Sequence, residues 1–93
     1  MRFEWDVDKN VSNQTKHGVS FELASEVFDD PLHVSVADRI EGGEQRWITL
    51  GLVEGIVILI VAHTWHDDGD DEVVRIISAR RATRKERRSY ENG

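Results

Sequence analysis

The spacing of hydrophobic residues divides the chain into a helical first third, a strand-rich middle and a short helical end. Phe3 and Trp5 alternate with polar neighbours, which favours a short strand or an extended arm. A helix is expected between Asp6 or Asp8, either of which can cap its start, and Gly18, which suits its end. The residues between are mostly polar, so this first helix should pack weakly.

A second helix is predicted after Ser20, a favourable N-cap. Its apolar residues recur at the i, i+3, i+4 and i+7 positions that form one face of a helix: Phe21, Leu23, Ala24, Val27 and Phe28. The helix should end at Asp29-Asp30-Pro31, because proline disfavours helical geometry in the residue before it.

The hydrophobic period then changes to two. Short β-branched or alternating segments predict strands at residues 33–37, 46–50, 56–62 and 73–79. Residues 56–62 form the most hydrophobic segment and are expected to be a central strand that is buried on both faces.

The links between these strands are short, and short links favour antiparallel pairing. A turn is predicted at residues 53–55 and an acidic hairpin loop at residues 66–71. Thr83-x-x-Glu86 has the form of a capping box and should open a last helix, residues 84–91. The order of elements predicts an α+β fold in one domain, residues 1–93, with helices packed on an antiparallel meander.

Charge is distributed unevenly along the chain. The formal charge of the whole sequence is −6, yet residues 75–93 contain seven of the twelve basic residues and only two of the eighteen acidic ones. Six of those seven are arginines, and arginine grips phosphate bidentately. A basic patch of this kind is typical of a phosphate-binding surface. A solvated helix face, or a surface that binds an acidic protein, would use the same arginines equally well.

Other bulk properties narrow the protein class. The sequence contains no cysteine, so it offers neither disulfides nor thiolate metal ligands. Its start resembles no signal peptide, and no apolar run reaches the roughly 18 residues that a membrane span needs. We therefore expect a cytoplasmic protein that uses no cofactor and has no membrane partner. Histidines and carboxylates would still be available as zinc ligands. The acidic segment that begins at His66 lacks the spacing of an EF-hand and is interpreted as a solvated loop.

Two pairs of basic residues are the first candidates for chemistry. Arg80 and Arg81 lie where the last strand leaves the sheet, just before the N-terminus of the last helix, and both features favour an anion. They are predicted to clamp a phosphate. Lys16 and His17 lie at a helix C-terminus, where the helix dipole favours a cation. They are interpreted as an acid/base and phosphate-contact pair, or simply as a helix end.

A further set of candidates comes from the strands. Glu44 and Arg46 precede Trp47 at a strand start and suit either an acid/base and clamp pair or a surface salt bridge. His63 and His66 follow the apolar strand. Trp5 and Trp47 are interpreted as core residues, although tryptophan also serves as a stacking platform for a nucleic-acid base.

The order of several motifs resembles the BrnT toxin family. The matching segments are Phe3-x-Trp5-Asp6-x-x-Lys9, residues 16–24, Val27-Phe28-x-Asp30-Pro31, Glu44-x-Arg46-Trp47 with Gly51, and residues 75–90, the most diagnostic of them. The resemblance extends from Phe3 to about Glu91. It implies a RelE-like α+β fold, in which an antiparallel β-sheet carries two N-terminal helices and one C-terminal helix.

The resemblance also implies a function. Members of this family are toxins of bacterial type II toxin–antitoxin pairs, and they block translation by cleaving RNA without a metal. The expected partner is a BrnA-type antitoxin with a ribbon-helix-helix part, which neutralises the toxin by binding it in a hetero-oligomer. DNA would then be contacted only through the antitoxin, as the complex represses its own promoter.

Cleavage of this kind requires attack of a ribose 2′-hydroxyl on the neighbouring phosphate, with a base, an acid and cations around the phosphorane. Proton transfer is assigned to His17, His63 or Glu44, with His17 preferred, and the phosphate clamp to Arg80 and Arg81. The remaining candidates are assigned to substrate binding: Lys16, Arg46, Arg75, Arg84 and His66.

One position departs from the family pattern. Many members carry Thr-x-Arg after the apolar strand, whereas this chain has Thr64-Trp65-His66. A protonated His66 would replace that arginine in part. The alternative hypothesis is therefore a catalytically weak or inactive binding module that docks the antitoxin and acts in promoter autoregulation. A DNA-binding regulator acting alone is disfavoured, since no helix-turn-helix is readable and most of the chain is acidic.

Overall fold

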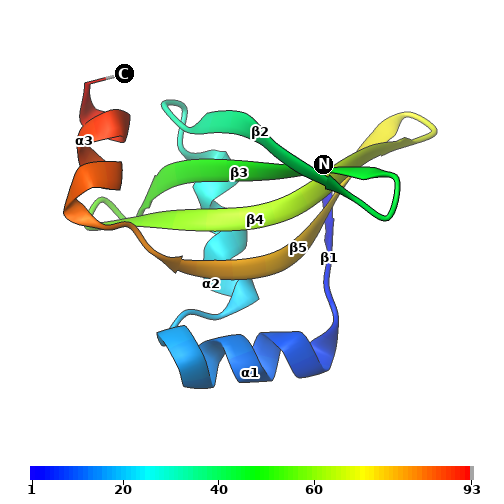
Figure 1. Ribbon diagram of the computed structural model, residues 1–93, viewed down its shortest axis with the longest axis horizontal. Coiled ribbons are helices and arrows are strands. Elements are labelled where there is room, and N and C mark those ends of the chain that lie inside the picture. Colours follow the sequence, from blue (N-terminus) through cyan, green and yellow to red (C-terminus); the bar gives the residue numbers. More distant parts are fainter. Residues whose placement is uncertain (93) are drawn as a thin grey trace.

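The computed structural model describes residues 1–92. Within them a five-stranded sheet with strand order β1-β5-β4-β3-β2 carries three α-helices and a short 3-10 helix, η1 (Figure 1). The elements along the chain are β1 (Arg2–Glu4), α1 (Val7–His17), α2 (Phe21–Ser25), η1 (Glu26–Asp29), β2 (Val34–Glu41), β3 (Glu44–Val53), β4 (Val57–Asp68), β5 (Asp71–Arg81) and α3 (Arg84–Glu91).

This architecture confirms the predicted α+β class, with two N-terminal helices and one C-terminal helix. Strands β2 to β5 pair antiparallel through short turns, and β4 is the central strand, as expected. One pairing differs from a fully antiparallel sheet, because β1 lies parallel to β5. No hairpin joins these two strands, so their relative direction is not constrained by a short link.

Helix α1 begins and ends where the sequence predicts. The Asp6 carboxylate accepts hydrogen bonds from the backbone N–H groups of Asp8 and Lys9, and Gly18 ends the helix in the left-handed conformation. The helix buries two asparagines rather than an aliphatic stripe. Asn13 donates to the Ala79 carbonyl and accepts from the Ala79 N–H, so its side-chain amide pairs with β5 as a neighbouring strand would.

The second predicted helix is divided into two parts. Ser20 caps α2, and the chain then tightens into η1 before Asp30. Phe21, Ala24 and Val27 are completely buried against the sheet, and Trp5 meets Phe21 edge-on. The predicted apolar stripe therefore packs on the sheet and covers the core, although its last turn is a 3-10 helix and not an α-helix.

All four predicted strands are longer than expected, and the predicted acidic loop at residues 66–71 is wrong. Strand β4 continues to Asp68 and β5 begins at Asp71, so only Gly69 and Asp70 form the turn. Ion pairs offset the repulsion among the acidic residues: Arg2 binds Asp68, and the N-terminal amine binds Asp71. Paired carboxylates can therefore remain within a strand that their charge alone would disfavour.

The two faces of the sheet differ. Helix α2 and η1 lie over one side of the sheet, which we call the helix-covered face, and α1 lies beside the edge of β5 (Figure 1). Helix α3 stands at one end of the sheet, against its other side. The helix-covered face holds the main core, which includes Val53, Leu59, Val61, Val74 and Ile76. Alternation along the strands places their neighbours on the opposite face, which we call the open face.

A close approach of two backbones fixes the position of η1 on the helix-covered face. A Cβ atom added at Gly51 would lie 2.6 Å from Val27 Cγ1 and 2.8 Å from the Val27 carbonyl oxygen. Only a residue without a side chain fits there. Gly51 thus allows η1 to pack directly on β3.

Candidate nucleic-acid interface

The open face gathers half of the residues predicted from the sequence to act on RNA. Strand register and alternation place on it Glu44 and Arg46 of β3, His66 of β4, and Arg75 and Arg80 of β5. Arg75 and Arg80 are five positions apart, roughly 16 Å along a strand. The open face therefore presents one cation near the middle of β5 and another near its C-terminal end, rather than both at one point.

The first group of these residues is a row that crosses three strands. Thr64 pairs with Arg75 across β4 and β5. Trp47 and His63 form the end pair of the β3–β4 ladder. Arg46 precedes Trp47 and Thr64 follows His63, so in this antiparallel pair Arg46 and Thr64 lie next to each other on the open face. The row therefore places a hydroxyl between two guanidinium groups.

Two polar atoms of this row are buried and have no hydrogen-bond partner in the described residues: Thr64 Oγ1 and Arg46 Nε. The Thr64 residue is 1% exposed, and the Arg46 side chain is 24% exposed. Arg46 does form an ion pair with Glu41, but it is long: Nη2 lies 3.7 Å from Glu41 Oε2. Buried polar groups in folded proteins nearly always form hydrogen bonds. Two neighbouring buried atoms without a hydrogen-bond partner therefore require an explanation.

The second group lies at the far end of β5, where Arg80 is already occupied. Its two terminal nitrogens donate to the two carboxylate oxygens of Glu86 at 2.8 and 2.9 Å. The hydrogen bond from Arg80 lowers the pKa of Glu86 to about 2, against the opposing effect of partial burial. Glu86 also accepts from the Thr83 N–H, so the predicted capping box of α3 is confirmed. A phosphate would have to displace Glu86 to reach the Arg80 fork.

Arg81 and Arg84 do not join the row around Thr64. Arg81 is exposed at the end of β5, on the strand position opposite Leu59, and lines a hollow with Arg87. Arg84 is exposed at the first position of α3. The predicted clamp pair is thus split, since Arg80 and Arg81 point to opposite faces of the sheet.

Helix α3 is tied to the body of the protein by Tyr90. Its hydroxyl donates to the carboxylate of Asp30, which also accepts from the backbone N–H groups of Leu32 and Leu52. Burial would raise the pKa of Asp30, but these hydrogen bonds outweigh it and lower the pKa; the same contact raises the pKa of Tyr90 to about 12. Beneath α3 the open face is apolar and forms a groove of about 280 Å³.

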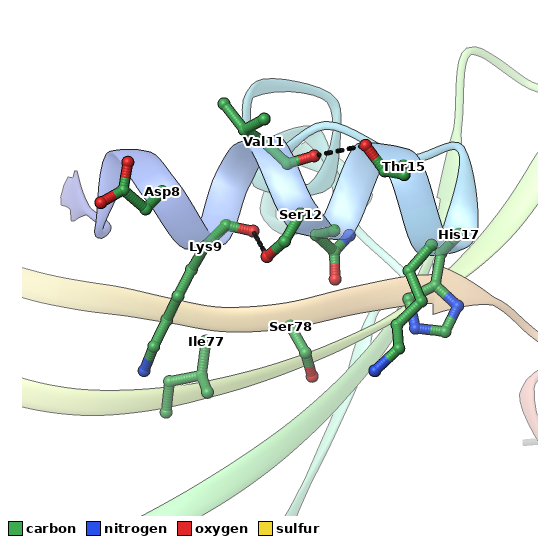
Figure 2. A pocket seen from close by; sticks show the side chains of 10 residues that line it. Asp8, Lys9, Val11, Ser12, Thr15, His17, Ile77 and Ser78 are labelled. Carbon is green, nitrogen blue, oxygen red and sulfur yellow. Dashed lines mark hydrogen bonds between the residues drawn. The ribbon is translucent and has the colours of Figure 1, made fainter.

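Lys16 and His17 lie apart from the open-face row, in a shallow hollow of about 820 Å³ between α1 and β5. Figure 2 shows Lys9 and His17 extending from α1 toward the strand that carries Ile77 and Ser78. Both Lys16 and His17 belong to the last turn of α1 and are exposed. The structure thus separates the preferred acid/base residue from Arg46 and Arg75.

His63 is completely buried on the helix-covered face. Its Nδ1 lies 3.1 Å from the Thr64 carbonyl oxygen, which can only accept, so Nδ1 carries the proton. Its Nε2 then accepts from the Thr49 hydroxyl at 2.7 Å, and Thr49 is in turn 2.7 Å from the Ser35 hydroxyl. Burial lowers the pKa of His63. Both ring nitrogens are therefore engaged within the core.

Sequence reasoning missed two functional or structural polar residues. Thr64 stands out in the sequence only as part of the Thr-x-His segment, because a threonine in a strand is ordinary on propensity alone. Asn13 looks like one more polar residue of a weak helix. The signal for Asn13 was its place on the side of α1 that faces the sheet, where an aliphatic residue is the usual choice.

Among residues 1–92, no three His, Asp or Glu side chains come together in a way that could hold a metal ion. In the same part of the chain, no helix is both long enough and apolar enough to cross a membrane.

The fold and its open face define a small α+β protein that presents arginines, a carboxylate and an imidazole on one face of a sheet. A sequence model of the family described as "Ribonuclease toxin, BrnT, of type II toxin-antitoxin system" matches residues 5–86. The chain therefore belongs to the BrnT family, and the family resemblance noted in its motifs is confirmed. Membership in a type II system implies an antitoxin partner.

A solved structure agrees with this assignment. The 1.1 Å crystal structure of the Brucella abortus ribonuclease toxin, BrnT, is similar with a TM-score of 0.64 and 26% sequence identity. The match covers 90% of this chain and 99% of the Brucella chain. No curated protein sequence matches the chain.

Proposed function

We propose that this protein is a toxin that cleaves RNA on its open face and so inhibits translation in the bacterial cytoplasm. The observation that carries the proposal is the grouping of Arg46, Arg75 and the buried Thr64 hydroxyl on one sheet face. Glu44 lies farther along β3 on the same face, and His66 lies farther along β4. Family membership supports a ribonuclease. The grouping supports this face as the place where it acts.

The proposed reaction is attack of a ribose 2′-hydroxyl on the adjacent phosphorus, with release of the 5′-oxygen. Arg46 and Arg75 stabilise the charge that builds on the phosphorane, as guanidinium groups do in dry or partly buried sites. Glu44 takes the 2′ proton, and a protonated His66 gives a proton to the leaving oxygen. The products are a 2′,3′-cyclic phosphate and a 5′-hydroxyl end, and no metal takes part.

Five other predicted residues lie outside this group of reacting side chains. Arg80, held by Glu86, contacts a more distant part of the substrate, and Arg84 attracts the RNA chain. His17, with Lys16, remains a second candidate for proton transfer, reached only if the RNA also crosses the hollow beside α1. His63 supports the sheet from within the core.

Expression without an antitoxin tests the proposal. The wild-type chain should arrest growth and produce RNA with new 5′-hydroxyl ends, and purified protein should cleave RNA in the presence of EDTA. The double variant Arg46→Ala/Arg75→Ala should lose both effects. A matched control is Lys9→Ala, which removes an exposed cation of α1 away from the open-face row. A double variant that cleaves as fast as Lys9→Ala would place the reaction elsewhere.

The proposed partner is a BrnA-type ribbon-helix-helix antitoxin that binds the toxin directly and represses the shared promoter as a complex. The exposed basic residues of α3 supply a surface for an acidic segment of that partner: Arg84, Lys85, Arg87 and Arg88. Co-expression of the antitoxin should restore growth, and the two chains should co-purify. Recovery of growth without a stable complex would contradict direct neutralisation.

A binding-only module is the second candidate, and two observations favour it. The Arg80 fork is filled by Glu86, and histidine stands at position 66 where many family members carry arginine. Under this alternative the chain docks its antitoxin, and expression alone is harmless. Growth arrest with fresh 5′-hydroxyl ends would exclude it.

A further inference from the structure

Thr64 is the most unusual polar residue of the open face. It lies in the central strand, it is 1% exposed, and its hydroxyl has no partner among the described residues. A valine would fill the same space without leaving a hydrogen bond unmade. A hydroxyl that is buried and unpaired is therefore not explained by packing.

The neighbour of Thr64 shows the same property. Arg46 Nε is also buried and unpaired, although the arginine has an acidic residue, Glu41, within 3.7 Å of another nitrogen. On the other side of Thr64, Arg75 is exposed and makes no ion pair with any of residues 1–92. Three donors on adjacent strands are thus free to meet one acceptor.

We propose that Thr64, Arg46 and Arg75 form a binding subsite for one phosphate group of the RNA backbone; below it is called the Thr64 subsite. The Thr64 hydroxyl and the Arg46 Nε–H donate to phosphate oxygens, and Arg75 closes over the anion from the edge nearer β1. The identity of the ligand rests on the proposed ribonuclease function, whereas the subsite itself rests on the two unpaired atoms.

The chemistry of the row favours phosphate over other ligands. Two guanidinium groups and a hydroxyl provide donors and positive charge, and phosphate oxygens are acceptors that carry negative charge. Glu4 lies beside Arg75 in the sheet register, but its ion pair is with Arg2. The carboxylate of Glu4 therefore does not occupy the position assigned to the phosphate.

Binding of an RNA oligomer that carries 2′-O-methyl groups tests the subsite, because such an oligomer cannot be cleaved. In the wild-type protein, the NMR resonance of the Arg46 Nε–H should shift and saturate as the oligomer is added. Thr64→Val should weaken binding about ten-fold, the loss expected for one hydrogen bond to a charged group. Thr64→Ser keeps the hydroxyl and should bind within about two-fold of wild type.

Two controls keep the outcome clear. Lys9→Ala should leave oligomer binding unchanged, and Thr64→Val should unfold thermally at the wild-type temperature or above it. Equal binding by Thr64→Val and wild type, or an Arg46 resonance that does not move, would overturn the subsite.

Failure of the subsite and failure of the ribonuclease are distinguishable. A wild-type protein that cleaves unmodified RNA, while Thr64→Val binds the oligomer normally, overturns the subsite alone. A protein that binds the oligomer through Arg46 and Thr64, but generates no 5′-hydroxyl ends, supports the subsite and removes the ribonuclease.

Discussion

Two threonines show how differently the faces of one sheet are used. Thr49 and Thr64 lie on neighbouring strands and are 0% and 1% exposed. On the helix-covered face, the Thr49 hydroxyl links Ser35 to His63 in a continuous hydrogen-bonded chain. On the open face, the Thr64 hydroxyl has no partner in residues 1–92.

The difference indicates that the two faces serve separate needs. On the helix-covered face, buried polar atoms are satisfied within the protein, as stability requires. On the open face, buried donors are left unmet beside two arginines, which weakens the folded state and suits an anionic ligand. Substitutions on the first face should therefore change stability, and substitutions on the second should change binding and cleavage.

The largest effect on stability is expected from Gly51→Ala. The new methyl group would lie 2.6 Å from Val27 Cγ1 and 2.8 Å from a backbone oxygen, so η1 must move away from β3. The free energy of unfolding in urea should fall by about 1–3 kcal/mol or more. Ser78→Thr adds one methyl group to an exposed position of the open face. This control should change the free energy of unfolding by less than about 0.5 kcal/mol. Equal losses in the two variants would contradict the comparison.

The two threonines themselves give the next effect. Thr49→Val removes the donor to His63 Nε2 and leaves a buried acceptor unpaired, which should cost about 1–3 kcal/mol of unfolding free energy. Thr64→Val breaks no hydrogen bond within the protein, so its free energy of unfolding should equal or exceed that of wild type. Urea denaturation of both variants measures the difference.

Histidine 63 should make stability depend on pH. Burial lowers its pKa in the folded state, so below about 6.5 the unfolded chain takes up a proton that the folded chain does not. The free energy of unfolding should therefore fall as the pH drops from about 7, by at most about 1.4 kcal/mol per pH unit for one proton. His63→Gln cannot titrate and should show a shallower slope. Parallel slopes for His63→Gln and wild type would rule out this role.

The smallest effect concerns α3, which covers part of the open face. The folded-state pKa of Glu86 is about 2, below its ordinary value of 4.5, so its contribution to docking is complete above about pH 4.5. As the pH falls from that value toward 2, Glu86 becomes protonated and releases Arg80. Amide hydrogen exchange in α3 should then accelerate before the sheet opens. Exchange that stays uniform across α3 and β4 at pH 3 would argue against this local release.

Much of this fold could be predicted from periodicity and caps. Asp6, Gly18, Ser20 and Thr83 mark helix ends in the sequence as they do in the structure, because each satisfies local backbone groups. Strand lengths could not be predicted in the same way. The extension of β4 to Asp68 depends on Arg2, which lies 66 residues away in the sequence.

The sequence could predict which residue types form the candidate site, but not which of those residues lie together in space. Arginine content indicated an anion, but Arg80 and Arg81 are adjacent in sequence and therefore face opposite sides of a strand. Arg46 and Arg75 are far apart in sequence and flank Thr64 because of the register of three strands. The β-bulge between Ala62 and His63, where β5 carries one extra residue, shifts that register in a way that no local pattern reveals.

The central claim, that one face stabilises the protein while the other acts on RNA, is tested most directly by single-turnover cleavage with Thr64→Val and Thr49→Val. The rates should be measured at a temperature at which both variants are folded. Thr64→Val should unfold like wild type and cleave about ten-fold more slowly, whereas Thr49→Val should be less stable and cleave at the wild-type rate. Wild-type cleavage by Thr64→Val, together with slow cleavage by folded Thr49→Val, would contradict the account.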